Sequence, residues 1–207
     1  MNIAVFASGF GSNLQAIIDA VKSKKIKANL KLVVSDVPSC YALKRAKKAK
    51  IETLVQLAKD FSDRQSYDRE IVKQLRKRKI DLVVLAGFMR MLSPYLVRAY
   101  KNRIINIHPA LLPSFKGTHG VRDAFEHGVK ITGPTVHFVD EKMDHGPIIL
   151  QEPVPVKEND TEETLAERIH EAEHRIYPLA VKLFVEGRLK VVGRKVRIIN
   201  NQIPITK

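Results

Sequence analysis

Alternating strands and helices predict the fold class of this 207-residue chain, an α/β protein with a doubly wound, mostly parallel sheet. Short apolar runs alternate with amphipathic stretches through residues 1–100, as they do where helices join parallel strands. Two further strand-like runs make the second half mixed, and a long amphipathic stretch then predicts a C-terminal helix. Together these observations indicate a Rossmann-like architecture.

The strands of the first half are short and rich in Val, Ile and Leu. The run at 81–86 is apolar throughout, as expected for a strand that helices cover on both faces. We expect the strands of this half at 2–7, 30–35, 52–55, 81–86 and 103–108.

The helices between these strands have recognisable start signals. Ser62 and Gln65 have the spacing of a capping box for the third helix. Ser93 and Pro94 supply an N-cap and a first-turn proline for the fourth. We expect these helices at 14–24, at 41–48, from the Ser62 cap to about 78, and from 94 to just before 104.

The second half predicts two strands and a long helix. Strand-like runs at 132–139 and 148–156 flank a connection that contains glycine and proline. The helix that follows is capped by Asp160 or Thr161 and ends near Val185.

The last residues predict a small hairpin over 190–199 that turns near Gly193. No internal repeat or linker composition interrupts the chain. We therefore expect one domain over 1–207, with a first half at 1–100, a second half at 101–189 and a hairpin with a tail at 190–207.

The composition is that of an ordinary folded protein, with 44% hydrophobic residues. The single cysteine, Cys40, leaves no internal disulfide and favours a reducing compartment. The N-terminus lacks the basic segment of a signal peptide, and no apolar run approaches the roughly 18 residues of a membrane span. We expect a cytoplasmic protein with no membrane partner.

The chain is strongly basic, with a formal charge of +14 and a pI near 9.9. Proteins that bind nucleic acid have such a balance, and so do enzymes that act on polyanionic metabolites. The few aromatic residues scarcely interleave with the basic runs, which disfavours a surface for stacking single-stranded bases. We expect small-molecule substrates, no nucleic acid, and a monomer or a homodimer.

Asn106 and His108 end a predicted strand two residues apart, so both side chains point to one face. Open α/β sheets bind ligands at this end of their strands. Asp144, in the later connection, would raise the pKa of the imidazole if the fold brings the two together. An amide, an imidazole and a carboxylate suit amine attack on a carbonyl. The alternative is a strand end and a loop aspartate that satisfy themselves locally.

The turn Gly9–Asn13 follows the first strand and opens a helix, which is the composition of an anion cradle. It is not a P-loop, since no Gly-Lys-Ser/Thr follows. As a dinucleotide-binding fingerprint it lacks the third glycine. Asp36, at the end of the second strand, still leaves binding of a nicotinamide cofactor as an alternative. A plain tight turn is the other alternative. We favour a phosphate monoester as the occupant.

His170, Glu173 and His174 form an H-x-x-E-H pattern on the long helix, as in some zinc proteases. Both histidines could reach a metal ion, but no third ligand is evident, so we expect no metal. The remaining histidines have no partner that the sequence identifies: His119, His127, His137 and His145.

With these features assembled, the chain closely resembles the folate-dependent formyltransferases, in particular the phosphoribosylglycinamide formyltransferases of purine synthesis. The asparagine–histidine–proline loop is shared by all formyltetrahydrofolate hydrolases and transferases, whereas the Gly-Ser-Asn loop and the helix with Glu173 narrow the resemblance to the glycinamide enzymes. The motifs that carry it are Ala7–Asn13, Ala86–Leu92, Asn106–Pro113 and Asp144–Pro147 with Gln151.

The resemblance implies the formyltransferase fold, 10-formyltetrahydrofolate as donor and co-substrate, and 5-phosphoribosylglycinamide as acceptor. The implied catalytic residues are Asn106, His108 and Asp144. The implied acceptor-binding residues are Gly11, Ser12, Asn13, Pro109, His170 and Glu173. The implied folate-binding residues are Arg64, Phe88, Met89, Arg90, Met91, Leu92, Val139, Asp140 and Met143.

Two related activities and one position stay open. Methionyl-tRNA formyltransferases share the catalytic loop but carry an extra C-terminal RNA-binding barrel, and formyltetrahydrofolate deformylases carry an N-terminal regulatory domain.

The resemblance also implies that the segment 116–119 lies in a mobile loop over the site. His145 directly follows Asp144 and is a possible competitor of His108 for that carboxylate.

Overall fold

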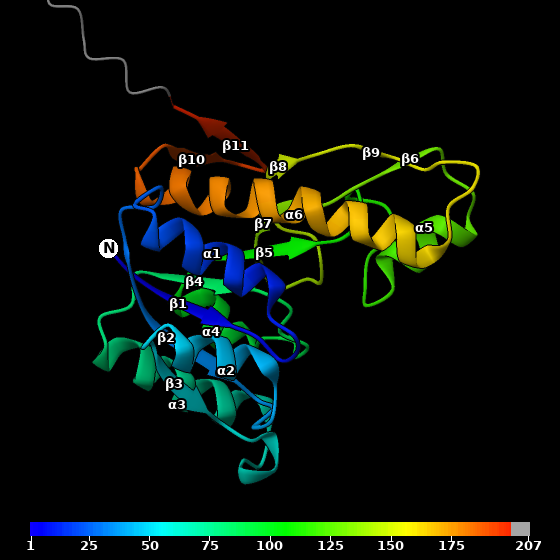
Figure 1. Cartoon of the computed structure of the whole chain (residues 1–207). Coiled ribbons are helices and arrows are strands. Elements are labelled where there is room, and N and C mark those ends of the chain that lie inside the picture. The colour runs from blue at the N-terminus through cyan, green and yellow to red at the C-terminus, as the bar shows by residue number, and fades with distance from the viewer. Residues whose placement is uncertain (200–207) are drawn as a thin grey trace, which may run out of the picture.

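Nine strands form one sheet in the computed structural model, which describes residues 1–199 (Figure 1). Across the sheet, the strands are β10 (Leu189–Val192), β11 (Lys195–Ile198), β8 (Ile148–Gln151), β7 (Thr135–Phe138), β5 (Ile104–His108), β4 (Leu82–Leu85), β1 (Asn2–Phe6), β2 (Asn29–Ser35) and β3 (Glu52–Val55).

The sheet is parallel from β3 through β2, β1 and β4 to β5, which confirms the predicted fold class. The antiparallel strands β7 and β8 extend it, and the β10–β11 hairpin follows on β8 through one parallel pair, Lys195 with Ile148. Because β2 and β4 flank β1 on opposite sides, the strand order reverses beside β1. The carboxyl ends of strands at such a point form a ligand-binding crevice.

Helices cover both faces of this sheet, as Figure 1 shows. Residues of α1, α2 and α6 join one core cluster, and residues of α3 and α4 join the other. The helical elements are α1 (Ser12–Lys22), α2 (Tyr41–Lys48), η1 (Ala58–Asp60), α3 (Arg64–Lys77), α4 (Pro94–Ala99), α5 (Gly120–Glu126) and α6 (Glu162–Val185).

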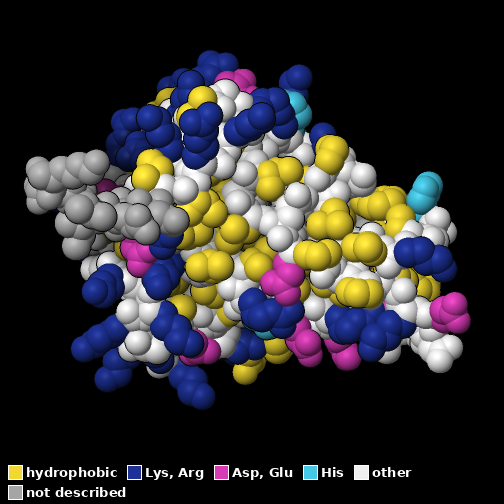
Figure 2. Space-filling model, turned by 90° about the horizontal axis from the view of Figure 1, so that it is seen from above, with side chains coloured by type: hydrophobic (Ala, Val, Ile, Leu, Met, Phe, Trp, Pro, Cys, Tyr) yellow, Lys and Arg dark blue, Asp and Glu magenta, His cyan; other side chains and the backbone are white. Residues whose placement is uncertain are grey.

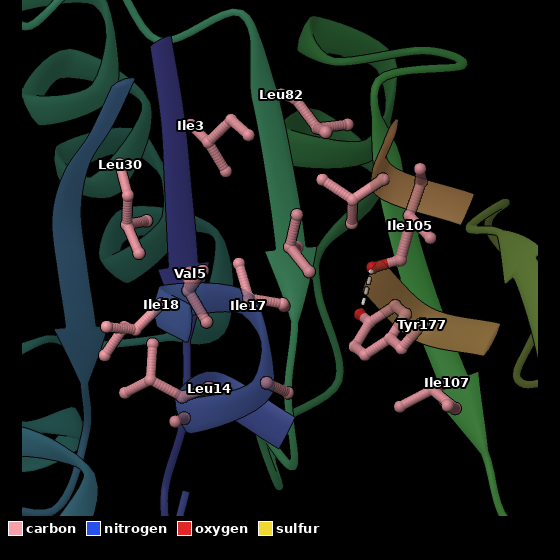
Figure 3. Packing of buried hydrophobic residues seen from close by; sticks show 14 of the residues in the cluster. Ile3, Val5, Leu14, Ile17, Ile18, Leu30, Leu82, Ile105, Ile107 and Tyr177 are labelled. Carbon is pink, nitrogen blue, oxygen red and sulfur yellow. Dashed lines mark hydrogen bonds between the residues drawn. The ribbon is translucent and has the colours of Figure 1, made fainter. Parts of the chain in front are cut away.

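Tyr177 of α6 lies at the centre of the larger core, where Figure 3 shows it beside the aliphatic side chains of β1, β5 and α1. Its ring is fully buried, and its hydroxyl lies 2.7 Å from the carbonyl oxygen of Leu85 and 3.1 Å from that of Ile105. A buried hydroxyl needs such partners. These bonds fix α6 against the ends of β4 and β5.

The start signals of the helices are partly confirmed. Ser93 caps α4 with Pro94 in its first turn, and Thr161 caps α6. The capping box predicted for α3 at Ser62 and Gln65 is wrong by one residue. Asp63 and Ser66 form it instead, with the Ser66 amide 2.7 Å from Asp63 Oδ1.

Each long strand predicted in the second half is divided in two. Gly133 and Pro134 separate β6 (Ile131–Thr132) from β7, and Pro153 lies between β8 and β9 (Val154–Pro155). Proline cannot donate to a strand ladder, which accounts for both breaks. The hairpin at 190–199 is confirmed, whereas the expected tail at 200–207 lies outside the described residues.

The short helix α5 was not predicted. Together with β9 and the first half of α6 it encloses a third, smaller core around Leu165 and Ile169. No helix within residues 1–199 has both the length and the apolar content that a membrane crossing requires.

Candidate active site

Ser8 ties together the chain segments that follow three parallel strands. Its hydroxyl donates to Asp36 Oδ1 at 2.6 Å and accepts from the backbone N–H of Met89 at 3.1 Å. Asp36 follows β2, and Met89 follows β4. The sequence had left Asp36 as a possible ligand of a nicotinamide cofactor. In the structure its carboxylate accepts from Ser8 and joins the loops at the crevice.

Asn106 of β5 lies directly opposite His137 of β7 in the antiparallel register. Its amide nitrogen lies 3.2 Å from His137 Nε2, and His137 Nδ1 lies 2.8 Å from the carbonyl oxygen of Phe138. A carbonyl can only accept, so Nδ1 carries the hydrogen and Nε2 accepts from Asn106. The amide is therefore held in one orientation at the edge of the site.

His108 is almost completely buried at the carboxyl end of β5, with 3% of its surface exposed. Its Nε2 donates to the carbonyl of Phe115 at 2.7 Å, and its Nδ1 lies 3.4 Å from Asp144 Oδ2. Burial lowers the pKa of His108, and the nearby carboxylate only partly opposes this effect. The expectation of a raised pKa is therefore wrong in its net direction, because the loss of hydration outweighs the ion pair.

Asp144 joins the two histidines. Its Oδ2 accepts from the Gly117 amide at 2.9 Å, and its Oδ1 lies 3.6 Å from His137 Nε2. Burial alone would raise the pKa of Asp144, but the His137 side chain, the Gly117 amide and the His108 charge together lower it. The carboxylate is thus charged near neutral pH.

His145 does not compete for Asp144. Its Nδ1 lies 2.7 Å from Asp140 Oδ2 instead. Asp144 has a φ of +47°, which turns its side chain back toward His108, while His145 points to the neighbouring carboxylate. The structure thus brings together the predicted residues Asn106, His108 and Asp144.

His137 is the residue of this cluster that sequence reasoning missed. It was left among the histidines with no identifiable partner, although its ring is 2% exposed and contacts both Asn106 and Asp144. The available signal was an ionisable residue in the middle of an otherwise apolar strand. Its partners depend on the register between β5 and β7, which local sequence does not specify.

Gly120, the first residue of α5, lies against the ring of His108. A Cβ at this position would lie 2.9 Å from His108 Nε2 and 3.1 Å from the Phe115 carbonyl oxygen. We expect Gly120→Ala to lower kcat by about 10- to 100-fold, because a small displacement of a reacting group is costly. Steady-state kinetics would measure the change.

The matched control is Gly128→Ala, near the other end of α5. There φ is +75° and a Cβ would meet nothing within 4 Å, so this change strains the helix end without touching His108. Equal kcat of the two variants would contradict the prediction that packing of Gly120 on His108 affects catalysis.

The predicted anion cradle is a rigid turn. Gly11 has a φ of +75°, and a Cβ there would lie 2.8 Å from the Cβ of Ala42 in α2. Arg45 of α2 donates from Nε to the Phe10 carbonyl at 3.0 Å and from Nη1 to Gln15 at 3.2 Å. Sequence reasoning also missed this arginine, which adds a positive charge beside the open N-terminus of α1.

Asn13 links the cradle to α6, because its amide donates to Glu173 Oε2 at 2.8 Å. The other side-chain atom of Asn13, Oδ1, is buried and makes no hydrogen bond to the described residues. Burial raises the pKa of Glu173 to about 7, against the opposing effect of Asn13. His170 and His174 are exposed on the same helix. Within residues 1–199 no three His, Cys, Asp or Glu side chains are grouped so that they could hold a metal.

We expect stability to depend on pH through Glu173. The pKa of Glu173 is raised from 4.5 to about 7 on folding, so the protonated side chain stabilises the fold below pH 4.5, and this stabilisation is lost as the pH rises through 7. Between pH 5 and 8, the free energy of unfolding, measured with urea, should fall by on the order of 2–3 kcal/mol more in the wild type than in Glu173→Gln. Glu167→Gln, an exposed change on the same helix, should behave like wild type. Identical pH dependence in all three proteins would contradict a buried, titrating Glu173.

The residues assigned to the folate lie in two loops and at the start of α3. Phe88 packs edge-on against Phe6, and the guanidinium of Arg90 lies 4.5 Å above the ring of Tyr67. Burial raises the pKa of Asp68, and the charges of Arg90 and Arg64 oppose this effect, so both cations lie near this carboxylate. Exposed apolar side chains of this region are Met89, Met91 and Met143, with 71%, 50% and 51% of their surfaces accessible.

The other predicted ligand-binding residues have less exposed positions. Leu92 and Val139 are partly buried against the second core, and Pro109 is partly buried directly after His108. Asp140 is half-buried and accepts from the backbone of Lys142 at 3.0 Å. Ser12 begins α1.

Comparison with known proteins identifies relatives along most of the chain. A family model described as formyl transferase matches residues 1–181. Phosphoribosylglycinamide formyltransferase of Escherichia coli strain K12 is 48% identical over 191 residues, which cover 92% of this chain and 90% of that protein.

Solved structures agree with this relationship. Glycinamide ribonucleotide transformylase 1 from Symbiobacterium toebii superposes with a TM-score of 0.95 at 46% identity, over 97% of this chain and 94% of that one. A formyltetrahydrofolate deformylase from Pseudomonas syringae pv. tomato has a TM-score of 0.90 at 27% identity, over 96% of this chain but 66% of that one. Because the family model spans most of the sequence and the Escherichia coli relative is nearly half identical along its length, this chain is an enzyme of the formyl transferase family.

Proposed function

We propose that this enzyme transfers the formyl group of 10-formyltetrahydrofolate to the amine of 5-phosphoribosylglycinamide in purine biosynthesis. The observation that carries this proposal is the cluster of Asn106, His108, His137 and Asp144 at β5, on the same parallel sheet as the turn Gly11–Asn13, which follows β1 two strands away. The names of its relatives support the same reaction.

The first step is attack of the acceptor's amine nitrogen on the formyl carbon of the folate. A carbon–nitrogen bond forms, and the carbonyl oxygen becomes the oxyanion of a tetrahedral intermediate. Asn106 Nδ2 and a protonated His108 would hold this oxyanion. The low pKa that burial gives His108 makes the charged ring a stronger donor to the oxygen once the proton is present.

Asp144 sustains the positive charge on His108 and takes part in moving the proton that the amine loses. When the intermediate collapses, the bond from the formyl carbon to N10 of the folate breaks, and this proton ends on N10. Atoms and charge then balance without a covalent enzyme intermediate. We also propose that the reaction needs no metal.

The Phe115 carbonyl occupies His108 Nε2 in the structure. A substrate oxygen that binds Nε2 must replace this carbonyl. We propose that the segment 113–119, held to Asp144 through the Gly117 amide, shifts when substrate binds. The segment would then act as a lid over the site.

The acceptor would bind with its phosphate on the amides of Gly11, Ser12 and Asn13 at the N-terminus of α1. Glu173, His170 and Pro109 would line the path from the ribose to the amine. Figure 2 shows Lys and Arg side chains in several groups toward the edges of the face drawn, and a formal charge of +14 favours such anionic ligands.

The donor would lie along the exposed apolar loops. Phe88, Met89, Met91 and Leu92 after β4 would contact the pteridine from one side, and Val139, Asp140 and Met143 from the other. Arg64 and Arg90, which lie near each other beside Asp68, would meet the benzoyl and glutamate portion of the donor and pair with the glutamate carboxylates. We propose that the chain works in the cytoplasm as a monomer or a homodimer.

One assay tests the proposal against its nearest alternatives. The enzyme is given 10-formyltetrahydrofolate with and without phosphoribosylglycinamide, and release of tetrahydrofolate is followed. Release that requires the glycinamide supports the transfer. Release that ignores the amine would indicate a deformylase, and a requirement for charged methionyl-tRNA would indicate the tRNA formyltransferase.

A further inference from the structure

Arg194, in the turn between β10 and β11, contacts the loop that carries Asp144. Its Nη2 donates to the backbone carbonyl of His145 at 2.7 Å. Its Nη1 lies 3.0 Å from Nε2 and 3.3 Å from Nδ1 of the same histidine. These contacts join segments 49 positions apart in the sequence, and Arg194 lies beyond the residues 1–181 that the family model matches.

The guanidinium group stacks on the imidazole of His145. An atom in the plane of the ring could not lie so close to both nitrogens without overlapping the carbon between them, so Nη1 lies over the ring face. In the plane, Nδ1 of His145 is already engaged with Asp140 Oδ2 at 2.7 Å. A planar guanidinium can stack and donate together, which an ammonium cannot do. Arg194 therefore holds both the backbone and the ring of His145.

The loop at residues 139–147, here called the Asp144 loop, is braced from within. Asp140 Oδ1 accepts from the Lys142 amide at 3.0 Å, and Asp144 has a positive φ of 47°. At Gly146 an added Cβ would lie 1.8 Å from the Phe138 carbonyl oxygen, so the loop backbone packs directly on β7. A loop this closely packed transmits a displacement of His145 to its neighbour Asp144.

Asp144 has little tolerance for such a displacement. Its Oδ2 lies 3.4 Å from His108 Nδ1, at the edge of direct interaction, and the same oxygen holds the Gly117 amide. A shift of a fraction of an ångström would therefore weaken both contacts. Arg194 is the contact that limits this shift from the solvent side.

We propose that Arg194 is a positioning residue, which acts through His145 to hold the Asp144 carboxylate against His108. The role of Asp144 in formyl transfer rests on the proposed function. The role of Arg194 rests on its contacts with His145. The turn of the β10–β11 hairpin would therefore support the position of Asp144 through this one side chain.

The test compares Arg194→Ala and Arg194→Lys in the full chain. We expect Arg194→Ala to lower kcat by about tenfold, because Asp144 is displaced, while KM for the acceptor stays near that of the wild type. Lysine keeps the charge and one donor for the His145 carbonyl but cannot stack, so Arg194→Lys should retain part of the activity.

NMR titration of the His108 imidazole separates positioning from a merely structural role. Burial lowers the pKa of His108, and the charge of Asp144 opposes this effect. Retreat of Asp144 in Arg194→Ala should therefore move the pKa of His108 further downward. A hairpin that serves only to cover the sheet would leave this pKa unchanged.

The control is Arg197→Ala, an exposed change on β11 of the same hairpin. It should match wild type in kcat and in the His108 titration, and thermal unfolding of all variants shows whether the hairpin is retained. Should Arg194→Ala unfold it, Arg194→Lys becomes the deciding variant. Wild-type kcat and an unshifted His108 in both Arg194 variants would overturn the proposal. A shifted His108 in a protein that transfers no formyl group would instead reject the proposed function and keep the positioning role.

Discussion

Replacement of His108 by alanine is expected to lower kcat by about 10²–10⁴-fold, since the imidazole would supply both a proton and an oxyanion contact. KM for either substrate should change little, because the interaction strengthens only as charge develops on the carbonyl oxygen. Single-turnover measurement of tetrahydrofolate formation would give the rate of the chemical step. The buried ring also packs on Gly120, so thermal unfolding should be measured in parallel.

The matched control is His127→Ala, at the C-terminal end of α5. This imidazole is exposed and packs edge-on against Phe115, so its removal tests for the effect of losing a histidine that contacts the segment 113–119. Turnover of His108→Ala within a few-fold of wild type would show that another group carries the acid–base step.

Asp144→Asn is the second large expected effect. The amide preserves the shape and can still accept from Gly117, but it cannot stabilise a positive charge on His108. We expect a loss of about 10²–10⁴-fold in kcat, comparable to the loss for His108. We also expect a lower pKa for the His108 imidazole, measured by NMR, because the raising influence of the carboxylate is gone.

The pH dependence of the wild type provides an independent check on Asp144. Its pKa lies below the ordinary 3.8, so the carboxylate stays charged down to acidic pH and its protonation should not limit kcat above pH 4. Asp123→Asn, an exposed change in the first turn of α5, is the control for lost negative charge. Full activity in Asp144→Asn would remove the carboxylate from the mechanism.

Local sequence predicted the parallel half of the fold well. Each strand-like run of the first half became a strand, most clearly β4, whose residues are all buried because helices cover both faces. The second half was predicted less well, since Gly133, Pro134 and Pro153 divide the two strand-like runs. Helix α6 continues through Pro178 despite the hydrogen bond that proline removes, because its packing against the sheet outweighs local preference.

The candidate site was predictable only where its residues share a short motif. Asn106 and His108 could be paired from strand periodicity alone. The structure places His108 beside Asp144 and connects Asn106 to Asp144 through His137. His137 and Arg45 reach the site from neighbouring elements, so their positions depend on strand register and helix packing rather than on spacing. The net pKa direction of His108 was missed for a related reason, because it depends on burial that only the folded chain reveals.

In the proposed reaction, the hydroxyl of Tyr177 would affect the length of acceptor that the site holds. Tyr177 follows Glu173 by one helical turn, and its bonds to the Leu85 and Ile105 carbonyls prevent α6 from sliding along the sheet. The separation between Glu173 and the end of β5 is therefore constant. An acceptor one methylene longer between ribose and amine would carry its nitrogen past the formyl carbon. Selection for acceptor length would thus come from a tyrosine that never touches the substrate.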